Sequence, residues 1–430
     1  MFQKLKQVWQ SKDLRNKIFF VIAILIFYRV LTQISLPGVN LENLSRIFQA
    51  NEFLSLFSLL TGGSAENFSI VLMGLSPYIN ASIIVQLLTV IVPYFENLSN
   101  EGDQGRQKLN SITRWLTLPL AFVQSYGMIV LLNSQSQLPI IENVGDPKVI
   151  LPIMLTVTAG TVLLMWLGEL ISEKGIGNGI SLIIFAGITA SIPGQMAQSL
   201  ALATSQPEQL IPLLVMIVIT IVLVVLTISI TEGYRKIPVT YAGQGARGQL
   251  SMIPIRVNQA GMIPIIFAVA LISFPTLLSQ ILQKASIESL QGVSNFFLTY
   301  FAVNSPLYLI CYFILILGFT SFYVSITFKP EQIAENIQKR GGYIPGIRPG
   351  KATSDFIGKI SMRLSLFGGL FIAIIALIPT LAQQGLTAAV ASTAPIIISG
   401  AGIIIIVGVV LDLIRQVNSQ LIMHDYSKLM

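Results

Sequence analysis

The sequence has little charge and few residues that catalyse reactions or bind metals. Asp, Glu, Lys and Arg make up only 10% of its 430 residues, whereas soluble domains average about 25%. The one cysteine, Cys311, cannot form an intramolecular disulfide, and the one histidine, His424, excludes a histidine-based metal site or catalytic dyad. No nucleotide-binding loop, nucleophile–base pair or metal cluster is present in the sequence. We therefore expect no enzyme activity, no metal and no cofactor.

Apolar residues are abundant instead. They make up 53% of the chain, and the mean hydropathy is +0.76, so we predict a polytopic membrane protein. A membrane-spanning helix needs roughly 20 predominantly apolar residues, and these runs lack the alternation of barrel strands. The fold class is therefore all-α, with ten candidate spans: Ile18–Ile34, Phe68–Val92, Trp115–Leu132, Ile150–Leu170, Ile176–Ile192, Leu210–Ile230, Ala260–Leu282, Pro306–Phe328, Leu364–Leu381 and Pro395–Leu411.

The positive charges indicate the orientation. Twenty-two of the 26 Lys and Arg residues lie in every second gap between the apolar runs, counting the two chain ends as gaps. Short loops rich in Lys and Arg stay in the cytoplasm, so both termini are predicted to be cytoplasmic. The two largest cytoplasmic loops are 231–259 and 329–363.

Ten spans divide into two fives, and because five is odd the halves have inverted topology. We assign 1–192 to the N-terminal half and 193–430 to the C-terminal half. Inverted halves often enclose a functional path at their interface, here a central pore. The spans contain only two charged residues, Arg29 and Glu169, both near a span end. Ion-coupled transporters carry ionisable groups at the midplane, and this chain has none there, which argues against coupling to an ion gradient. A ten-helix secondary transporter of a small solute, which the inverted halves would fit, is the alternative hypothesis.

The connection between the first two spans contains a short apolar piece, Asn51–Leu60 (NEFLSLFSLL), followed by Thr61, Gly62, Gly63 and Ser64. Ten residues are too few to cross a bilayer. The piece is therefore re-entrant, interfacial or folded back into the protein.

Seven ordered segments carry a resemblance to a known family and together run nearly from end to end. They are YRVLTQISLPGVN (28–40), LTGGSAENFSIVLMGLSPYINASIIVQLLTVIVP (60–93), EGDQGRQKLNSITRW (101–115), MWLGELISEKGIGNGISLIIFAGI (165–188), YRKIPVTYA (234–242), VNQAGMIPIIFA (257–268) and GGYIPGIRPGKAT (341–353). In these segments the chain resembles the SecY family, the large subunits of bacterial and plastid protein-conducting channels. The resemblance implies a clamshell of ten helices that passes unfolded preproteins across the membrane and opens laterally to insert transmembrane segments.

The resemblance also implies a constriction made of aliphatic side chains, at Leu75, Ile79, Ile180, Ile184, Ile266 and Ile405. The first four form two pairs spaced i, i+4, which face the same way on a helix. A narrow aliphatic ring excludes water and ions by dewetting. For any one of these residues the alternative is ordinary packing against lipid or another helix.

The short piece at about 51–64 corresponds to the plug of the family, a half-helix that closes the pore from outside, with an interfacial helix as the alternative. The plug positions are Phe53, Phe57, Leu60, Gly62 and Gly63. The lateral gate is expected between spans two and three on one side and seven and eight on the other. Its uncharged polar residues would be Gln86, Gln124 and Asn258, joined by hydrogen bonds when the gate is shut.

The two basic loops match the docking surfaces of the family, with Arg235, Lys236, Arg247 and Arg348 as the candidate contacts. Arginine can bind phosphate or carboxylate in a bidentate manner, and basic loops gain affinity for RNA through its phosphates. The implied partners are the ribosome, the motor ATPase SecA, the small subunits SecE and SecG, preprotein signal sequences and membrane lipid.

The implied location is the bacterial plasma membrane, with a plastid thylakoid membrane as an alternative. The loop departs from the family pattern at 243–246, where GQGA replaces a basic run.

Overall fold

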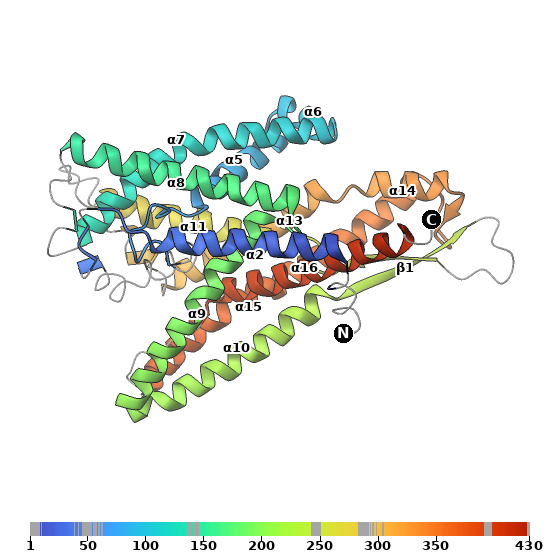
Figure 1. The fold of residues 1–430 in the computed structure, drawn as a ribbon. Helices are drawn as coiled ribbons and strands as arrows, with labels where there is room; N and C mark the ends of the chain where they lie inside the picture. Colours follow the sequence, from blue (N-terminus) through green and yellow to red (C-terminus); the bar gives the residue numbers. More distant parts are fainter. Residues whose placement is uncertain are drawn as a thin grey trace.

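The computed structural model describes most of the chain: residues 9, 11–37, 39–41, 43–44, 54, 58, 61, 63–135, 140–141, 146–241, 251–282, 292, 294, 296–297, 299–302, 305–390 and 398–427. Within these residues the dominant elements are ten long helices, one at each predicted span (Figure 1). They are α2 (Lys12–Gln33), α5 (Ser76–Ile91), α7 (Asp103–Gln135), α8 (Pro147–Lys174), α9 (Gly179–Ser205), α10 (Leu210–Thr231), α11 (Ile263–Leu282), α13 (Pro306–Thr327), α15 (Lys351–Val390) and α16 (Gly400–Ser427).

Among the described residues, seven helices are long and apolar enough to cross a membrane, or eight if the bent pair α5 and α6 (Pro93–Asn100) counts as one span. Helices α2 and α11 occupy the two remaining predicted spans. The predicted all-α polytopic membrane fold is therefore confirmed.

The second span differs from its predicted form. Phe68–Leu75 is a series of turns rather than helix, and α5 begins only at Ser76. Pro77 therefore lies in the first turn of α5 instead of interrupting a helix, where proline is tolerated because the first N–H groups have no helical acceptor. At the other end, Pro93 starts α6, which is bent by 99° from α5.

Helices α8 and α9 are joined by a tight turn in which glycine is required. A Cβ added at Gly179 would lie 1.9 Å from the carbonyl oxygen of Gly168, and Gly177 has a φ of +96°. Helix α9 then continues through Pro193 to Ser205. Residue 192 therefore lies within a helix, and the division of the chain into halves there stays a prediction.

A small antiparallel sheet in the loops was not predicted. Strand β1 (Tyr234–Tyr241) lies between β2 (Ser251–Arg256) and β3 (Gly342–Tyr343). The alternation of inward and outward residues on β1 is typical of a half-buried strand, with Ile237 and Val239 buried and their neighbours more exposed. These two side chains pack with apolar residues of α14 (Pro330–Lys339) and α15.

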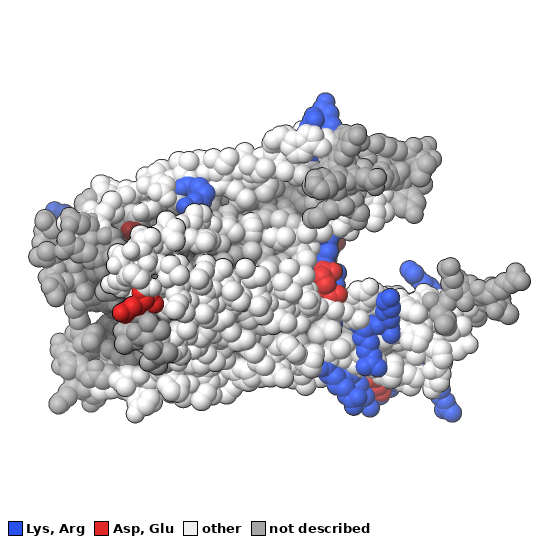
Figure 2. Space-filling view, turned by 90° about the horizontal axis from the view of Figure 1, so that it is seen from below, with Lys and Arg blue, Asp and Glu red and all other residues white. Residues whose placement is uncertain are grey.

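Helices α6 and α14, strand β1, the start of α2 and the end of α16 lie at the same end of the molecule in Figure 1. We call this the basic end, because the space-filling view in Figure 2 shows most of its blue Lys and Arg atoms there, while the middle of the molecule is almost entirely white. An uncharged middle between charged ends is the surface expected of a membrane-embedded protein.

Candidate functional site: an apolar ring beside a cavity

All six predicted ring residues lie in one hydrophobic cluster. Leu75, Ile184 and Ile405 are buried, with exposed fractions of 4%, 5% and 0%. The other three, Ile79, Ile180 and Ile266, are partly buried against them. The residues come from four segments that are distant in sequence, α9, α11, α16 and the start of α5, so the fold itself assembles the cluster.

Local structure fixes the direction of the two i, i+4 pairs. Leu75 precedes α5, and its carbonyl oxygen accepts the first helical hydrogen bond from the Ile79 N–H at 3.0 Å. At the start of α9, the Asn178 side chain caps the helix by accepting from the Ser181 N–H at 3.2 Å. This cap places Ile180 and Ile184 one turn apart on the same face.

A cavity of about 410 Å³ adjoins the ring. Ile79, Ile180, Ile184 and Ile266 line its apolar part, while Leu75 and Ile405 lie behind them in the cluster. The rest of its lining is mixed: Met262, Ile263 and Phe267 are apolar, and the polar or charged residues include Asn178, Arg256, Gln259, Asp412 and Arg415. Four of the six ring residues thus border a cavity whose lining mixes polar and apolar groups.

The described part of the predicted plug is folded into the protein. Leu54, Ser58 and Thr61 are helical, and all have exposed fractions of 2% or less. The carbonyl oxygen of Thr61 accepts a hydrogen bond from the Tyr28 hydroxyl at 3.3 Å. Burial of three residues spaced along one helical face indicates a segment folded back into the molecule rather than one lying on a membrane surface.

Thr61 also contacts the start of the second span. A Cβ built on Gly74 would lie 3.4 Å from the Thr61 Cα, so the backbones approach closely at the residue next to Leu75. Gly63 has a φ of +81°, a backbone conformation that glycine adopts readily. The other plug positions, Phe53, Phe57, Leu60 and Gly62, lie outside the described residues.

The three predicted gate residues are only partly brought together. Gln86 and Asn258 both line the cavity, whereas Gln124 does not. Within the described part of the chain, no hydrogen bond joins the three side chains. Asn258 instead accepts from the Gly261 N–H at 2.9 Å, and the buried Oε1 of Gln124 has no hydrogen-bond partner there. The hydrogen-bonded gate cluster therefore stays a prediction.

Three of the four docking candidates are exposed at the basic end. Arg235 and Lys236 lie on β1, where the Lys236 Nζ is 5.5 Å from the centroid of the Tyr234 ring. Arg348 lies in a turn that ends at Gly350, which has a φ of +96°. This turn is closed by a hydrogen bond of 2.9 Å from the Thr353 hydroxyl to the Arg348 carbonyl oxygen. Arg247 lies outside the described residues.

One interaction in this region was not predicted. Arg415, on α16, donates to the Glu232 carboxylate at 2.6 Å and to the Thr231 carbonyl oxygen at 3.2 Å, and it also pairs with Asp412 at 3.2 Å. The Arg415 guanidinium thus ties the end of α10, and the base of β1, to the helix that carries Ile405. Only the i, i+3 spacing of Asp412 and Arg415 was visible in the sequence.

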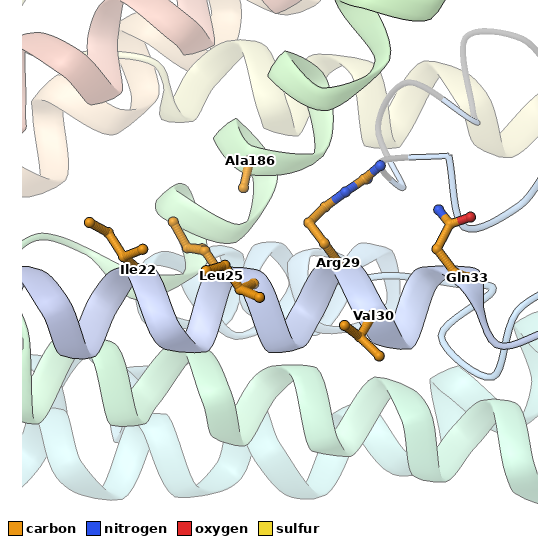
Figure 3. A pocket seen from close by; sticks show the side chains of 7 residues that line it. Ile22, Leu25, Arg29, Val30, Gln33 and Ala186 are labelled. Atoms are coloured by element: carbon orange, nitrogen blue, oxygen red, sulfur yellow. The ribbon is translucent and has the colours of Figure 1, made fainter.

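A second hollow, of about 470 Å³, lies between α2 and α9 and is separate from the ring. Figure 3 shows the α2 side chains, among them Ile22, Leu25 and Arg29, with Ala186 of α9 facing them. Five of its seven lining residues are aliphatic, and two of these, Ile26 and Val30, are more than half exposed. Such a hollow suits an apolar neighbour in the membrane.

No group of His, Cys, Asp and Glu within the described residues could hold a metal ion.

Comparison with known proteins agrees with this geometry. The SecY family model matches residues 69–414. The chain belongs to the SecY family. A protein translocase subunit SecY from Corynebacterium glutamicum is 38% identical over 441 residues, covering 99% of both chains, and one from Bacillus licheniformis is 40% identical with the same coverage.

Solved structures share the fold. A protein-conducting channel superposes with a TM-score of 0.65 at 18% identity, covering 93% of this chain and 91% of the other. Sec61 from the canine ribosome–channel complex gives a TM-score of 0.62 at 18% identity, covering 93% and 91%. The alternative hypothesis of a small-solute transporter is not supported, because these relatives are translocase subunits and protein-conducting channels.

Proposed function

We propose that this chain is the central subunit of a protein translocation channel, which passes unfolded preproteins through its ring and releases apolar segments sideways into lipid. The observation that carries the proposal is the gathering of six aliphatic side chains from four distant segments into one apolar cluster, four of which also line a cavity that has polar and charged residues in its wall. A ring of this kind blocks ions by dewetting, yet its side chains are flexible enough to yield around an extended peptide.

The buried segment at Leu54, Ser58 and Thr61 would act as the plug. The closeness of Thr61 to Gly74, directly beside the ring residue Leu75, supports a role for this segment in keeping the ring closed. The gate would open between α5 and α7 on one side and α11 and α13 on the other, where α11 packs against all three.

The basic end would face the cytoplasm of a bacterium, with both termini on that side. Its exposed cations then suit two partners that drive translocation, the ribosome and the motor SecA. Sec61 in a ribosome–channel complex has the same fold, which supports the first. The small subunits SecE and SecG would brace the helices from the lipid side, and signal sequences would enter at the gate. The chain would then need no catalytic site, because the partner supplies the energy.

The proposal is tested by reconstituting the protein with its small subunits in a planar bilayer, intact and with residues 51–64 deleted. The intact channel should be silent, and the deletion should flicker open to ions because the ring has lost its support. Proteoliposomes with SecA and ATP should protect a preprotein from external protease. If neither protein conducts and no preprotein is protected, the channel function is wrong.

A further inference from the structure

One hydrogen bond crosses the proposed gate at the basic end. The Lys329 Nζ donates to the Asn100 Oδ1 at 2.8 Å, although the two residues are 229 positions apart. Asn100 ends α6, in the connection between α5 and α7, and Lys329 follows α13. The bond therefore joins the second and third spans to the eighth, the elements that must separate when the gate opens.

The acceptor is held firmly on its side. Helix α6 turns away from α5 at Pro93 and lies against α7, where Leu98 is only 3% exposed. The approach of the two helices leaves no room for a side chain, because a Cβ at Gly105 would lie 1.8 Å from the Leu98 carbonyl oxygen. Asn100 consequently moves with α7.

The donor is held on the other side by its neighbour in sequence. Pro330 disfavours helical geometry at the residue before it, and Lys329 has a φ of −106° and a ψ of 89°. Only Phe328 and Lys329 separate α13 from α14. Helix α14 packs against α15 and β3, and β3 pairs with β1. Lys329 thus joins the gate helix α13 to the surface proposed for docking.

We propose that Asn100 and Lys329 form a latch that sets how hydrophobic a signal segment must be to open the gate. The inference rests on the proposed channel function. The bond forms while the helix pair α5 and α7 lies against the pair α11 and α13, and it is lost when the two pairs separate. It therefore favours the closed gate. Both side chains are exposed to water, where one hydrogen bond changes an equilibrium by a factor of about 2 to 10. A bond of this strength changes the hydrophobicity that a signal segment needs to open the gate, but it does not keep the gate closed against a strongly hydrophobic segment.

The first test compares two preproteins, one with a strong signal sequence and one with a signal weakened by removing leucines. Lys329→Ala should raise passage of the weak preprotein about two- to fivefold and leave the strong one unchanged. Asn100→Asp should lower passage of the weak preprotein, because a carboxylate binds the ammonium more strongly than an amide does. Lys329→Arg keeps a positively charged donor and should leave the passage of the weak preprotein relative to the strong one at its wild-type value.

Lys108→Ala is the matched control. Lys108 pairs with Glu101, beside Asn100, at 3.5 Å, but both partners lie on the same side of the gate. This substitution should leave the ratio between the two preproteins unchanged. A general loss of stability would lower passage of both preproteins together, whereas loss of a latch raises only the weak one. Equal ratios for Lys329→Ala and the wild type would overturn the inference.

The second test joins the two positions covalently. Asn100→Cys and Lys329→Cys are introduced together with Cys311→Ser, and a bismaleimide with an internal disulfide links the new thiols. Cross-linking should occur in the resting channel, block both preproteins and be reversed by reduction. If the cross-linked channel passes the strong preprotein at the normal rate, the latch is wrong while the channel function stands. If no variant and no wild-type protein passes either preprotein, the proposed function itself has failed, and the latch with it.

Discussion

The ring and the basic end achieve their proposed effects by opposite physical means. The ring depends on the absence of polar atoms: its six aliphatic side chains, three of them at most 5% exposed, lie within one larger apolar cluster. The basic end depends on many exposed charges spread over β1, α14 and the turns between them. One polar side chain is enough to admit water and ions to an apolar constriction, whereas the binding affinity of a charged surface is the sum of many small contributions. Single substitutions should therefore have large effects in the ring and modest ones at the basic end.

The largest effect should come from a charge in the ring. Ile405→Asp replaces a side chain with an exposed fraction of 0% in that cluster. A carboxylate attracts water into the constriction and removes the dewetted barrier, so we expect the ion current of the resting channel in planar bilayers to rise at least about tenfold. Ile405→Leu keeps the site apolar and should stay silent. A silent Ile405→Asp channel that still translocates would show that the seal lies elsewhere.

A smaller ion leak should follow when the plug segment can no longer pack against Gly74. Gly74 has a φ of +53°, and Gly74→Val would push its side chain against Thr61 as well as straining the backbone. We expect intermittent ion currents, weaker than those of Ile405→Asp, because the ring itself remains apolar.

Gly102→Val tests whether backbone strain alone, without contact with Thr61, produces the ion currents. Gly102 has a φ of +76° but no atom within 4 Å of its Cβ position, so this variant carries the strain, which costs about 1–2 kcal/mol, without the collision. Equal currents in the two variants would mean that Gly74 is not a seat for the plug.

The same contrast explains what the sequence could predict. Long apolar runs are local, so all ten helices were found, and i, i+4 spacing together with family resemblance located a ring whose residues the fold does bring together. The bonds that depend on distant segments were not foreseeable. Arg415 meets Glu232 across 183 residues, and Lys329 meets Asn100 across 229.

Two further features have local explanations. The Asn258 side chain accepts from the N–H of Gly261, three residues on, as Asn commonly does in turns, and its bond across the gate stays a prediction. The sheet was missed because β1 is a single run of eight residues in a loop read only for its charges, although the alternation around Ile237 and Val239 was visible in the sequence.

At the basic end, a single charge should matter less. Arg348→Ala should weaken binding of the protein to ribosomes about two- to tenfold and reduce the slope of log affinity against log salt by about one, as expected for the loss of one phosphate contact. Lys339→Ala is the control, because Lys339 already pairs with Glu335 on the same helix at 2.8 Å. A slope unchanged by Arg348→Ala would remove this residue from the docking surface.

The smallest effect tests how the two regions are connected. Arg415→Ala removes the bonds from α16 to Glu232 and to the Thr231 carbonyl oxygen. Because Glu232 is half exposed, water screens the pair, and we expect a loss of about 1 kcal/mol, visible as a drop of a few degrees in the thermal midpoint of the detergent-solubilised protein. Lys17→Ala, which breaks an exposed pair within one helix, should cause no measurable shift. If Arg415→Ala also leaves the midpoint unchanged but lowers the response of translocation to ribosome or SecA binding, the pair transmits docking to the ring-bearing helix and does not stabilise the fold.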